Sequence, residues 1–310
     1  MAVLPIPLSK IVGDTPNFEP TIASFSQTAA AEPELKSAAP AFALVVPTLR
    51  EAGNIGALLA RIRSALEPLH LDYEILVVDD SSGDGTAEVV AAEAQRDGRI
   101  RLLVRDGQCG LAGAILHGWQ HSDAPILGVM DADLQHPPEL LPAMLAAMLD
   151  GSDLAIGSRY AAGGRMAAWN PLRRLASRAA VWATRPIQRK DVFAEDPMSG
   201  FFFVRRECIE GLTFQPCGFK LLLEILVRAR LRSVEEIPFS FGVRFRGSSK
   251  LSFRVACDFV RLLARLHRSR FFDRKREPEM DLTPVAVQVF YEPASELRAT
   301  PRAVELQEDI

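Results

Sequence analysis

The chain has 310 residues, of which 48% are hydrophobic and 24% are charged, so a disordered chain and a small disulfide scaffold are both excluded. Its 36 lysines and arginines stand against 39 aspartates and glutamates, and the net charge of −3 argues against a nucleic-acid-binding protein. Four cysteines without CxxC spacing predict unpaired thiols and a cytoplasmic protein. No apolar run reaches the roughly 18 residues of a membrane span.

Residues 1–40 contain six prolines and no helical or strand period, which predicts a flexible N-terminal tail. From Phe42, short apolar runs alternate with stretches of helical length, the pattern of an α/β domain with a mostly parallel central sheet flanked by helices. We expect strands at 42–46, 73–79, 100–104, 125–131 and 153–158. A helix should begin at the N-cap Asn54 and bury Ile55, Leu58, Leu59, Ile62 and Leu66 on one face.

After Arg159 the regular alternation ends. The sequence predicts a strand at 200–204, a helix near 218–230, a pair of strands within 233–243, and a basic helix from Ser252 to about Arg270. We therefore divide the folded domain into a nucleotide-sugar-binding half, 41–160, and an acceptor-binding half, 161–272. The remaining residues, 273–310, are predicted to form a mobile acidic tail, because 277–310 hold eight acidic residues and two arginines.

Two carboxylates follow the fourth expected strand, in the sequence Asp131-Ala132-Asp133-Leu134-Gln135. Residues two apart in extended backbone point to the same side, so these three oxygen-bearing side chains can converge. Hard oxygen ligands at this spacing suit Mg²⁺ or Mn²⁺ bound together with a phosphate-bearing substrate. Solvated loop acids are the ordinary alternative, but ligands in open α/β sheets gather at the carboxyl ends of strands, where this pair lies.

A second acidic cluster, Asp79-Asp80-Ser-Ser-Gly-Asp84-Gly-Thr86, ends the second expected strand. Its carboxylates could accept hydrogen bonds from a nucleobase or ribose, whereas Asp84 and Thr86 are expected to shape a turn and cap the next helix. For Asp79 and Asp80, functional and structural roles are both left open. The chain has neither a GxGxxG nor a GxxxxGK[ST] motif, which argues against a dinucleotide-dependent dehydrogenase and a P-loop ATPase.

Basic residues complete the candidate site. Arg159 follows the fifth expected strand, and Arg244 and Lys250 lie in a stretch of small residues that could grip a diphosphate or a lipid phosphate. Between Arg165 and Lys190 there are seven cations and no acid, interleaved with large apolar residues. This stretch, like the basic helix after Ser252, predicts an amphipathic surface that could lie on an anionic membrane, although such stripes often face a protein core.

Taken in order, several motifs resemble those of the dolichol-phosphate mannosyltransferases, which are GT-A glycosyltransferases of family 2. They are Pro47-Thr-x-x-Glu51, Val78-Asp-Asp80-Ser-Ser-Gly-Asp84-Gly-Thr86, Gly110-Leu111 with His117-Gly118, Asp131-Ala-Asp133-Leu-Gln135, Gly157-Ser-Arg159-Tyr160, Asp196-Pro-Met-Ser-Gly200 and Arg244-x-x-Gly247-x-Ser249-Lys250. The resemblance covers residues 42 to about 265. It implies a single GT-A domain and metal-dependent, inverting transfer of mannose from GDP-mannose to a dolichyl or polyprenyl monophosphate.

The resemblance also implies roles for individual residues. The nucleotide-sugar site would include Pro47, Leu49, Glu51, Val78, Asp80, Asp131, Ala132, Arg159, Arg244 and Lys250. Asp131, Asp133 and Gln135 would bind Mg²⁺ or Mn²⁺, and Asp131, Asp133 and Arg159 would be catalytic. Arg173, Ser177 and Lys250 would hold the acceptor phosphate. At position 49 the family often has tyrosine, so Leu49 is a departure. The acceptor implies a protein bound peripherally to the cytosolic face of a membrane.

Other readings stay open at this stage. A polyprenyl-phosphate glucosyl- or N-acetylglucosaminyltransferase using a UDP-sugar would keep the fold. The sequences of these loops do not distinguish a guanine-binding site from a uracil-binding site. A non-catalytic nucleotide-sugar-binding protein would keep the fold without the reaction. A glycosyltransferase with a soluble acceptor would leave the basic amphipathic segments without a role.

Overall fold

A computed structural model describes residues 39–106, 110–162, 165–166, 171–214, 220–241 and 253–273. The compact unit to which all of them but Ala39 belong spans Pro40–Ile310. Its strands are β1 (Phe42–Thr48), β2 (Tyr73–Asp79), β3 (Ile100–Val104), β4 (Ile126–Val129), β5 (Leu154–Ser158), β6 (Arg165–Met166), β7 (Phe202–Arg205), β8 (Val234–Pro238) and β9 (Ser240–Phe241). Its helices are α1 (Ile55–Leu66), α2 (Thr86–Arg96), α3 (Gly110–Gln120), α4 (Leu141–Leu149), α5 (Pro171–Thr184), α6 (Arg206–Ile209), α7 (Leu221–Arg228) and α8 (Phe253–Asp273), with short 3₁₀ turns at Glu67–Leu69, Pro138–Leu140 and Arg185–Ile187.

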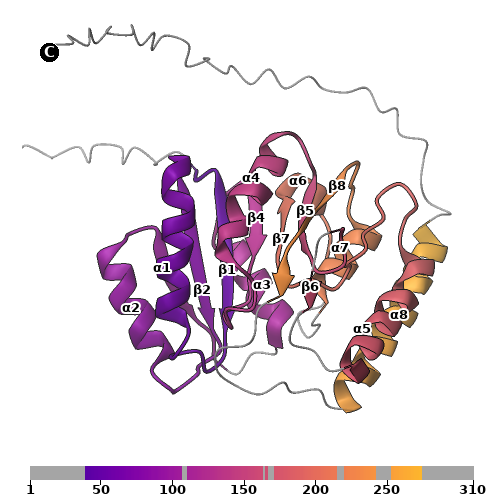
Figure 1. Ribbon diagram of the computed structural model, residues 1–310, viewed down its shortest axis with the longest axis horizontal. Coiled ribbons are helices and arrows are strands. Elements are labelled where there is room, and N and C mark those ends of the chain that lie inside the picture. Colours follow the sequence, from indigo (N-terminus) through magenta and orange to yellow (C-terminus); the bar gives the residue numbers. More distant parts are fainter. Residues whose placement is uncertain are drawn as a thin grey trace, which may run out of the picture. The chain divides into compact units, whose positions relative to one another are not determined.

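Seven strands form one sheet in the order β3-β2-β1-β4-β7-β5-β8, and β6 pairs with β9 in a separate two-stranded sheet (Figure 1). Every pairing in the large sheet is parallel except those of β7, which runs antiparallel to both β4 and β5. The mostly parallel α/β sheet predicted from the sequence is confirmed. Two strands lie within 233–243, as predicted, but they do not pair with each other: β8 joins β5 and β9 joins β6.

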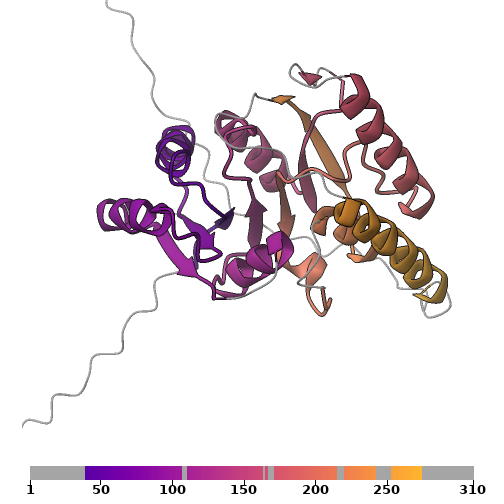
Figure 2. The same ribbon diagram turned by 90° about the horizontal axis from the view of Figure 1, so that it is seen from below.

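Both faces of the sheet are buried, as the continuous apolar strands require. Alternate residues of β1 point to opposite cores: Phe42, Leu44 and Val46 pack with α1 and α4, whereas Ala43 and Val45 pack with α3 and α7. Figure 2 shows helices on both faces of the sheet. The helix α3 packs close to β1 because residue 118 is glycine: an added Cβ there would lie 2.7 Å from a methyl group of Val45.

The helix α1 matches its prediction on the buried face, where Ile55, Leu58, Leu59, Ile62 and Leu66 are all buried. Asn54 is the N-cap residue, but its side chain makes no capping hydrogen bond and instead donates to Glu51 Oε2 at 2.6 Å. The cap position is therefore confirmed and the expected cap chemistry is wrong. The N–H of Glu51 is bound by the hydroxyl of Thr86 at 3.0 Å, which ties the start of α1 to the start of α2.

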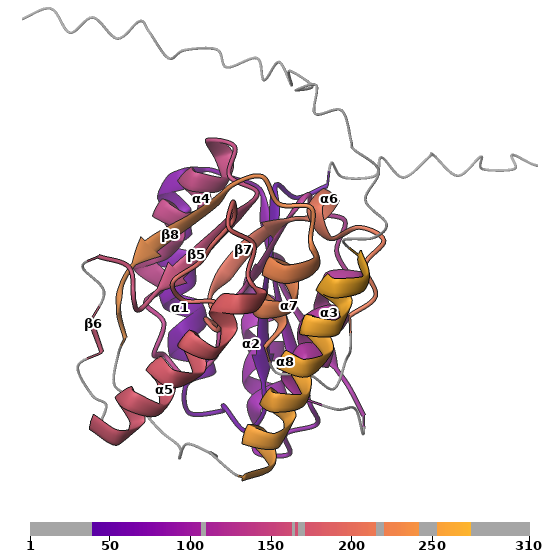
Figure 3. The same ribbon diagram turned by 90° about the vertical axis from the view of Figure 1, so that its right-hand side faces the viewer.

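The helices α5 and α8 lie at the end of the sheet away from α1 and α2 (Figures 1 and 3). Leu262 and Leu266 of α8 bury their side chains against Ile187 and Leu223, and Arg265 reaches Glu224 Oε2 of α7 at 3.3 Å. One face of α8 is therefore part of the core. Among the helices of the described residues, none combines the length and the apolarity needed to cross a bilayer.

Candidate functional site

The candidate site lies along one edge of the large sheet. The parallel strands β1, β2, β4 and β5 end there, at Thr48, Asp79, Val129 and Ser158, and the antiparallel strand β7 begins there. This edge is where ligands bind in open α/β sheets. The loops are conformationally constrained: Arg50, Ser81 and Leu134, which follow β1, β2 and β4, are three of the four described non-glycine residues with positive φ. Such backbone strain is concentrated at functional sites.

Two carboxylates follow β4 at this edge. The side chain of Asp131 is 36% exposed, and Asp133 and Gln135 are buried. Asp133 Oδ1 accepts the backbone N–H of Gln135 at 3.1 Å, which orders the turn. Burial raises the pKa of the Asp131 carboxyl and the Asp133 carboxylate raises it further, whereas His136 opposes the rise. The negative charge at Asp131 is thus unfavourable as it stands, and a bound cation would relieve it.

Gly200 makes room for this carboxylate. A Cβ at position 200 would lie 2.5 Å from Asp131 Oδ2, so only glycine lets the loop before β7 approach so closely. His136 also approaches this carboxylate, with Nδ1 3.8 Å from Asp131 Oδ2, and its burial lowers the pKa of the imidazole. His136 is 2% exposed and borders the site.

The residues at this edge fit a divalent cation. Asp131, Asp133 and Gln135 supply hard oxygen donors, and the raised pKa of the Asp131 carboxyl marks a place where positive charge is favourable. A second cluster, Asp153 with Glu207 and Cys208, has ligand atoms within 4.8 Å of one another. It lies at the opposite edge of the sheet, because Asp153 precedes β5.

That second cluster does not fit a metal. Asp153 already accepts the Arg232 side chain on both oxygens, at 3.1 and 3.2 Å. Burial raises the pKa of the Cys208 thiol to about 12, so the thiolate that a metal would need is costly to form there. Cys208 is a free thiol, as the sequence predicts for the four cysteines; the other three lie outside the residues described with side chains.

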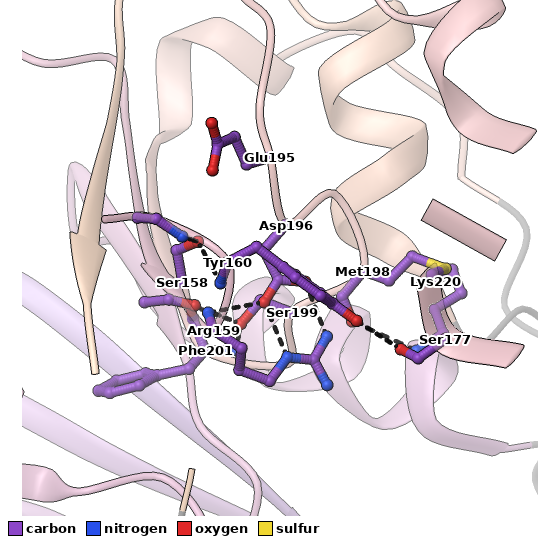
Figure 4. Close-up of polar contacts among 12 residues, drawn as sticks. Ser158, Arg159, Tyr160, Ser177, Glu195, Asp196, Met198, Ser199, Phe201 and Lys220 are labelled. Atoms are coloured by element: carbon purple, nitrogen blue, oxygen red, sulfur yellow. Dashed lines mark hydrogen bonds and ion pairs between the residues drawn. The ribbon is translucent and has the colours of Figure 1, made fainter. Parts of the chain in front are cut away.

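A buried ion pair joins the ends of β5 and of the loop before β7 (Figure 4). Arg159 donates from Nε and Nη2 to the two oxygens of Asp196, both at 2.7 Å, and its backbone N–H also donates to Asp196 at 3.0 Å. Asp196 is fully buried. The backbone N–H of Asp196 is held in turn by Glu236 Oε1 of β8 at 2.9 Å. Burial raises the pKa of the Glu236 carboxyl, and the hydrogen bonds that it accepts from the backbone N–H groups of Glu195 and Asp196 oppose the rise.

Lys220 is a site residue that the sequence reading missed. Its Nζ donates to the carbonyl of Met198 at 3.3 Å, in the loop that also carries Asp196. Burial lowers the pKa of the Lys220 ammonium to about 8, the nearby Arg159 lowers it further, and Asp131 and Asp196 favour the charge. The signal in the sequence is a single cation directly before the apolar run Leu221-Leu222-Leu223, although the run itself reads as an ordinary helix start.

The residues predicted to hold an acceptor phosphate are only partly described. Ser177 of α5 exchanges a hydrogen bond with the phenol of Tyr160 at 2.7 Å, and the two side chains point toward one another in Figure 4. The Arg159 guanidinium carbon lies 5.7 Å from the centre of the Tyr160 ring, so Ser177 is connected to the Arg159 region. Arg173 belongs to α5 but its side chain lies outside the described residues, as do Arg244 and Lys250 entirely.

The predicted nucleotide residues fall into two groups. Pro47 and Val78 are neighbours in the β1–β2 register and their side chains are buried, so only their backbone can line a ligand site; Ala132 is also buried. Leu49, by contrast, is 52% exposed. Asp80 forms an ion pair with Arg105, whose Nε and Nη2 both donate to Asp80 Oδ1, at 2.8 and 2.5 Å.

The role left open for Asp79 is structural, and Asp84 has the structural role predicted for it. Asp79 is 1% exposed and accepts the Thr48 hydroxyl at 2.8 Å and the Ser82 N–H at 2.9 Å, so it stabilises the loop instead of meeting a ligand. Asp84 accepts the N–H of Thr86 at 3.1 Å and its hydroxyl at 2.5 Å, which confirms the predicted turn and helix start.

The model of the family described as "Glycosyl transferase family 2" matches residues 43–213. Among characterised proteins, the dolichol-phosphate mannosyltransferase of Pyrococcus furiosus is 41% identical over 223 residues, 72% of this chain and 62% of that protein. The protein of the same name from Mycosarcoma maydis is 36% identical over 76% of this chain and 82% of its own length. The one from Saccharomyces cerevisiae is 35% identical over 74% and 88%.

Among solved structures, glucosyl-3-phosphoglycerate synthase from Mycobacterium tuberculosis, in complex with Mn²⁺, UDP-glucose and glycerol 3-phosphate, superposes with a TM-score of 0.53. The identity is 19%, over 74% of this chain and 80% of that chain, so this likeness concerns the fold. The GT-A fold implied by the sequence motifs is confirmed. With its sheet, its carboxylate pair and its relatives taken together, the chain belongs to glycosyl transferase family 2 and, within it, to the dolichol-phosphate mannosyltransferases.

Proposed function

We propose that the chain transfers mannose from GDP-mannose to a dolichyl or polyprenyl monophosphate, with inversion at the anomeric carbon. An oxygen of the lipid phosphate bonds to C1 of mannose while the bond from C1 to the diphosphate breaks and GDP leaves. The observation that carries this proposal is the grouping of Asp131, Asp133, Arg159 and Lys220 at one sheet edge, in a chain whose relatives bear this name.

The proposed transfer reaction does not need a general base. A phosphate monoester has a second pKa near ~6, so the lipid phosphate is already anionic at neutral pH and needs no base to activate it. The main requirement is to stabilise the negative charge that develops on the departing diphosphate. Arg159, held by Asp196, and Lys220, held by Met198, are partly buried cations that would serve this task.

Asp131, Asp133 and Gln135 are the residues that would hold a divalent cation. When bound, Mg²⁺ or Mn²⁺ supplies Lewis-acid stabilisation of the diphosphate. Arg244 and Lys250 would complete the donor site, and Arg173, Ser177 and Lys250 the acceptor phosphate site, as the family motifs imply. In this division the donor binds mainly in residues 41–160 and the acceptor mainly in 161–272.

The proposed lipid acceptor lies in a membrane, and α5 has an exposed face suited to binding a membrane surface. Leu175 and Trp182, seven residues apart and therefore on one helix face, are 66% and 70% exposed, with the exposed Arg178 between them. Exposed apolar side chains flanked by cations favour peripheral binding to an anionic leaflet. We propose that this face meets the cytosolic side of the membrane that holds the acceptor.

The test is transfer of radiolabelled sugar into an organic-extractable product, with a polyprenyl phosphate, Mn²⁺ and either GDP-mannose or UDP-glucose. Label in the lipid phase from GDP-mannose alone, lost on addition of EDTA, is the expected result. Label from UDP-glucose alone would keep the fold and site but replace the donor. Absence of lipid label from both donors would contradict the lipid acceptor.

A further inference from the structure

Glu236, in the middle of β8, binds the loop before β7 through both of its carboxylate oxygens. The backbone N–H of Glu195 donates to Oε2 at 2.7 Å, and the backbone N–H of Asp196 donates to Oε1 at 2.9 Å. The side chain of Ser158 is a third hydrogen-bond partner of this carboxylate. Two adjacent N–H donors that face two oxygens suit a carboxylate, because an amide side chain has only one oxygen.

These three contacts converge on the ion pair between Arg159 and Asp196 (Figure 4). Ser158 is the last residue of β5, directly before Arg159, and its side chain is buried. Glu236 therefore binds both segments of backbone that carry the ion pair, one at the residue before Arg159 and the other at Asp196 itself.

The direction of the Arg159 guanidinium depends on the backbone at residues 195–196. The carboxylate of Asp196 accepts three hydrogen bonds from Arg159, so it sets where the guanidinium points. Residues 195–196 belong to no helix or strand, so no regular backbone ladder fixes them in place. The carboxylate of Glu236 supplies acceptors for the two N–H groups of this segment.

The negative charge of Glu236 is costly in this position. Burial raises the pKa of its carboxyl, the hydrogen bonds described above oppose the rise, and the nearby Asp196 carboxylate adds to it. A second carboxylate beside a buried ion pair lowers stability unless it makes bonds that a neutral side chain cannot make. The two N–H groups, one on each oxygen, are such bonds. This arrangement favours a role in orienting Arg159 over a role in the stability of the fold.

We propose that Glu236 is a positioning residue for the transfer reaction: it holds the backbone at Glu195 and Asp196 so that Asp196 directs Arg159 toward the departing diphosphate. This inference rests on the proposed function for the presence of that diphosphate, and it adds a residue that acts through Asp196 and Arg159. Negative charge develops on the diphosphate as its bond to C1 of mannose breaks. A misdirected guanidinium therefore costs more in the transition state than in binding of the intact donor.

The experiment is steady-state kinetics of mannose transfer by the full chain carrying Glu236→Gln, with Mn²⁺. Glutamine keeps the size of the side chain but places its NH₂ group against one of the two backbone N–H groups. The value of kcat should fall roughly tenfold, as for the loss of one hydrogen bond to a charged group. The KM for GDP-mannose should change by less than about twofold, because the lost interaction belongs to the transition state.

Glu235 supplies the matched control. It is the preceding residue of β8, so its side chain points to the other face of the sheet. It is exposed and accepts the hydroxyl of Ser152 at 3.3 Å, at the opposite edge of the sheet from the candidate site. Glu235→Gln should therefore keep the wild-type kcat and KM.

A second substitution tests whether Glu236 acts through Arg159. Arg159→Lys keeps the charge but loses the two-pronged contact with Asp196. In this background Glu236→Gln should lower kcat by less than about twofold, because the guanidinium that it orients is already absent. A tenfold loss in both backgrounds would overturn the proposal, and so would a wild-type kcat in Glu236→Gln alone.

A conservative variant covers the case in which Glu236→Gln does not fold, as circular dichroism would report. Glu236→Asp keeps the charge, but its oxygens end one methylene short of the loop, so the same fall in kcat is expected. A wild-type kcat in Glu236→Asp would then contradict the proposal.

Calorimetric titration with GDP and with UDP, in the presence of Mn²⁺, separates this proposal from the proposed reaction. A free nucleoside diphosphate carries the terminal charge that develops in the transition state, so Glu236→Gln should weaken binding of the preferred nucleotide several-fold. If the wild-type chain transfers no mannose to lipid, the proposed reaction is contradicted, and this loss of affinity would still support the role of Glu236. A wild-type affinity in Glu236→Gln would overturn that role.

Discussion

The aspartates at the site edge differ in which groups stabilise their negative charge. Asp79 and Asp196 are buried and accept hydrogen bonds from the protein, so they hold loops in place. Asp131 is partly exposed, borders Gly200 and has a raised pKa because of burial. A carboxylate that the protein leaves in an unfavourable charged state is where an external cation gains most. We therefore propose Asp131 and its neighbour Asp133 as the carboxylates that would hold the cation.

Replacing Asp133 by alanine should abolish mannose transfer, because one of two proposed carboxylate ligands is lost. The initial rate is measured with saturating Mn²⁺ and GDP-mannose. Asp123→Ala is the matched control, since Asp123 is exposed and precedes β4 at its other end. A near-normal rate for Asp133→Ala at saturating metal would show that the metal assignment is wrong.

Lys220 should leave a signature in the pH dependence of stability. Its pKa is lowered from 10.5 to about 8, chiefly by burial, so below pH 8 the folded chain carries a buried charge at a cost. Between pH 8 and 10.5 the unfolded chain keeps a proton on Lys220 that the folded chain has lost. The free energy of unfolding therefore rises with pH over this range. Lys220→Met should therefore raise the free energy of unfolding at pH 7, on the order of 2 kcal/mol.

Urea unfolding of Lys220→Met and the wild-type chain at pH 7 and pH 10 measures this difference, which should shrink at the higher pH. Lys190→Met is the control, because Lys190 is exposed and its replacement should change the free energy of unfolding little. A difference independent of pH would mean that the Lys220 ammonium is not destabilised in the folded chain. The same substitution should lower the transfer rate, because a cation near the diphosphate is removed.

At the scale of the elements, local sequence patterns predict where strands and helices lie better than they predict which strands pair. The strands β2 and β3 span the predicted residues, and the buried face of α1 is the predicted one, because both follow from hydrophobic periodicity within a short segment. The antiparallel place of β7 between β4 and β5, and the division of β8 and β9 between two sheets, depend on contacts between distant segments.

The same distinction applies to the site. Asp131, Asp133 and Arg159 follow strands and were predicted from that position. Lys220 and Arg105 required the structure, because their partners are the carbonyl of Met198, 22 residues earlier in the chain, and the carboxylate of Asp80, 25 residues earlier. A sequence pattern does not indicate which lysine or arginine is turned inward.

The exposed face of α5 yields a prediction about membrane binding. Leu175→Ser combined with Trp182→Ser should reduce sedimentation with anionic vesicles several-fold, because two large apolar side chains no longer enter the interface. The unfolding midpoint should change little, since both side chains are exposed. Val181→Ser is the contrasting variant: this side chain is 8% exposed, so stability should fall. Unchanged sedimentation of the double variant would contradict membrane contact through this face.

At the scale of the whole molecule, the compact unit Pro40–Ile310 contains every residue of the site. A chain that begins at Pro40 should therefore bind GDP with the affinity of the full chain and unfold at the same urea concentration. Calorimetry and urea titration of the two chains provide the comparison. A loss of GDP affinity on removal of residues 1–39 would show that the N-terminal segment, predicted to be a flexible tail, contributes to the donor site.

The reversed strand β7 also has a consequence for how the protein folds. β4 and β5 have no pairing with each other, since β7 lies between them and bonds to both. During folding, β4 and β5 are not joined in one sheet until β7, residues 202–205, pairs with both. Because β7 lies some 70 positions after β4, this pairing closes a long loop and is slow. Asp131 and the Arg159–Asp196 pair meet only at that moment, so refolding kinetics followed by GDP binding should show nucleotide affinity appearing in the slowest phase.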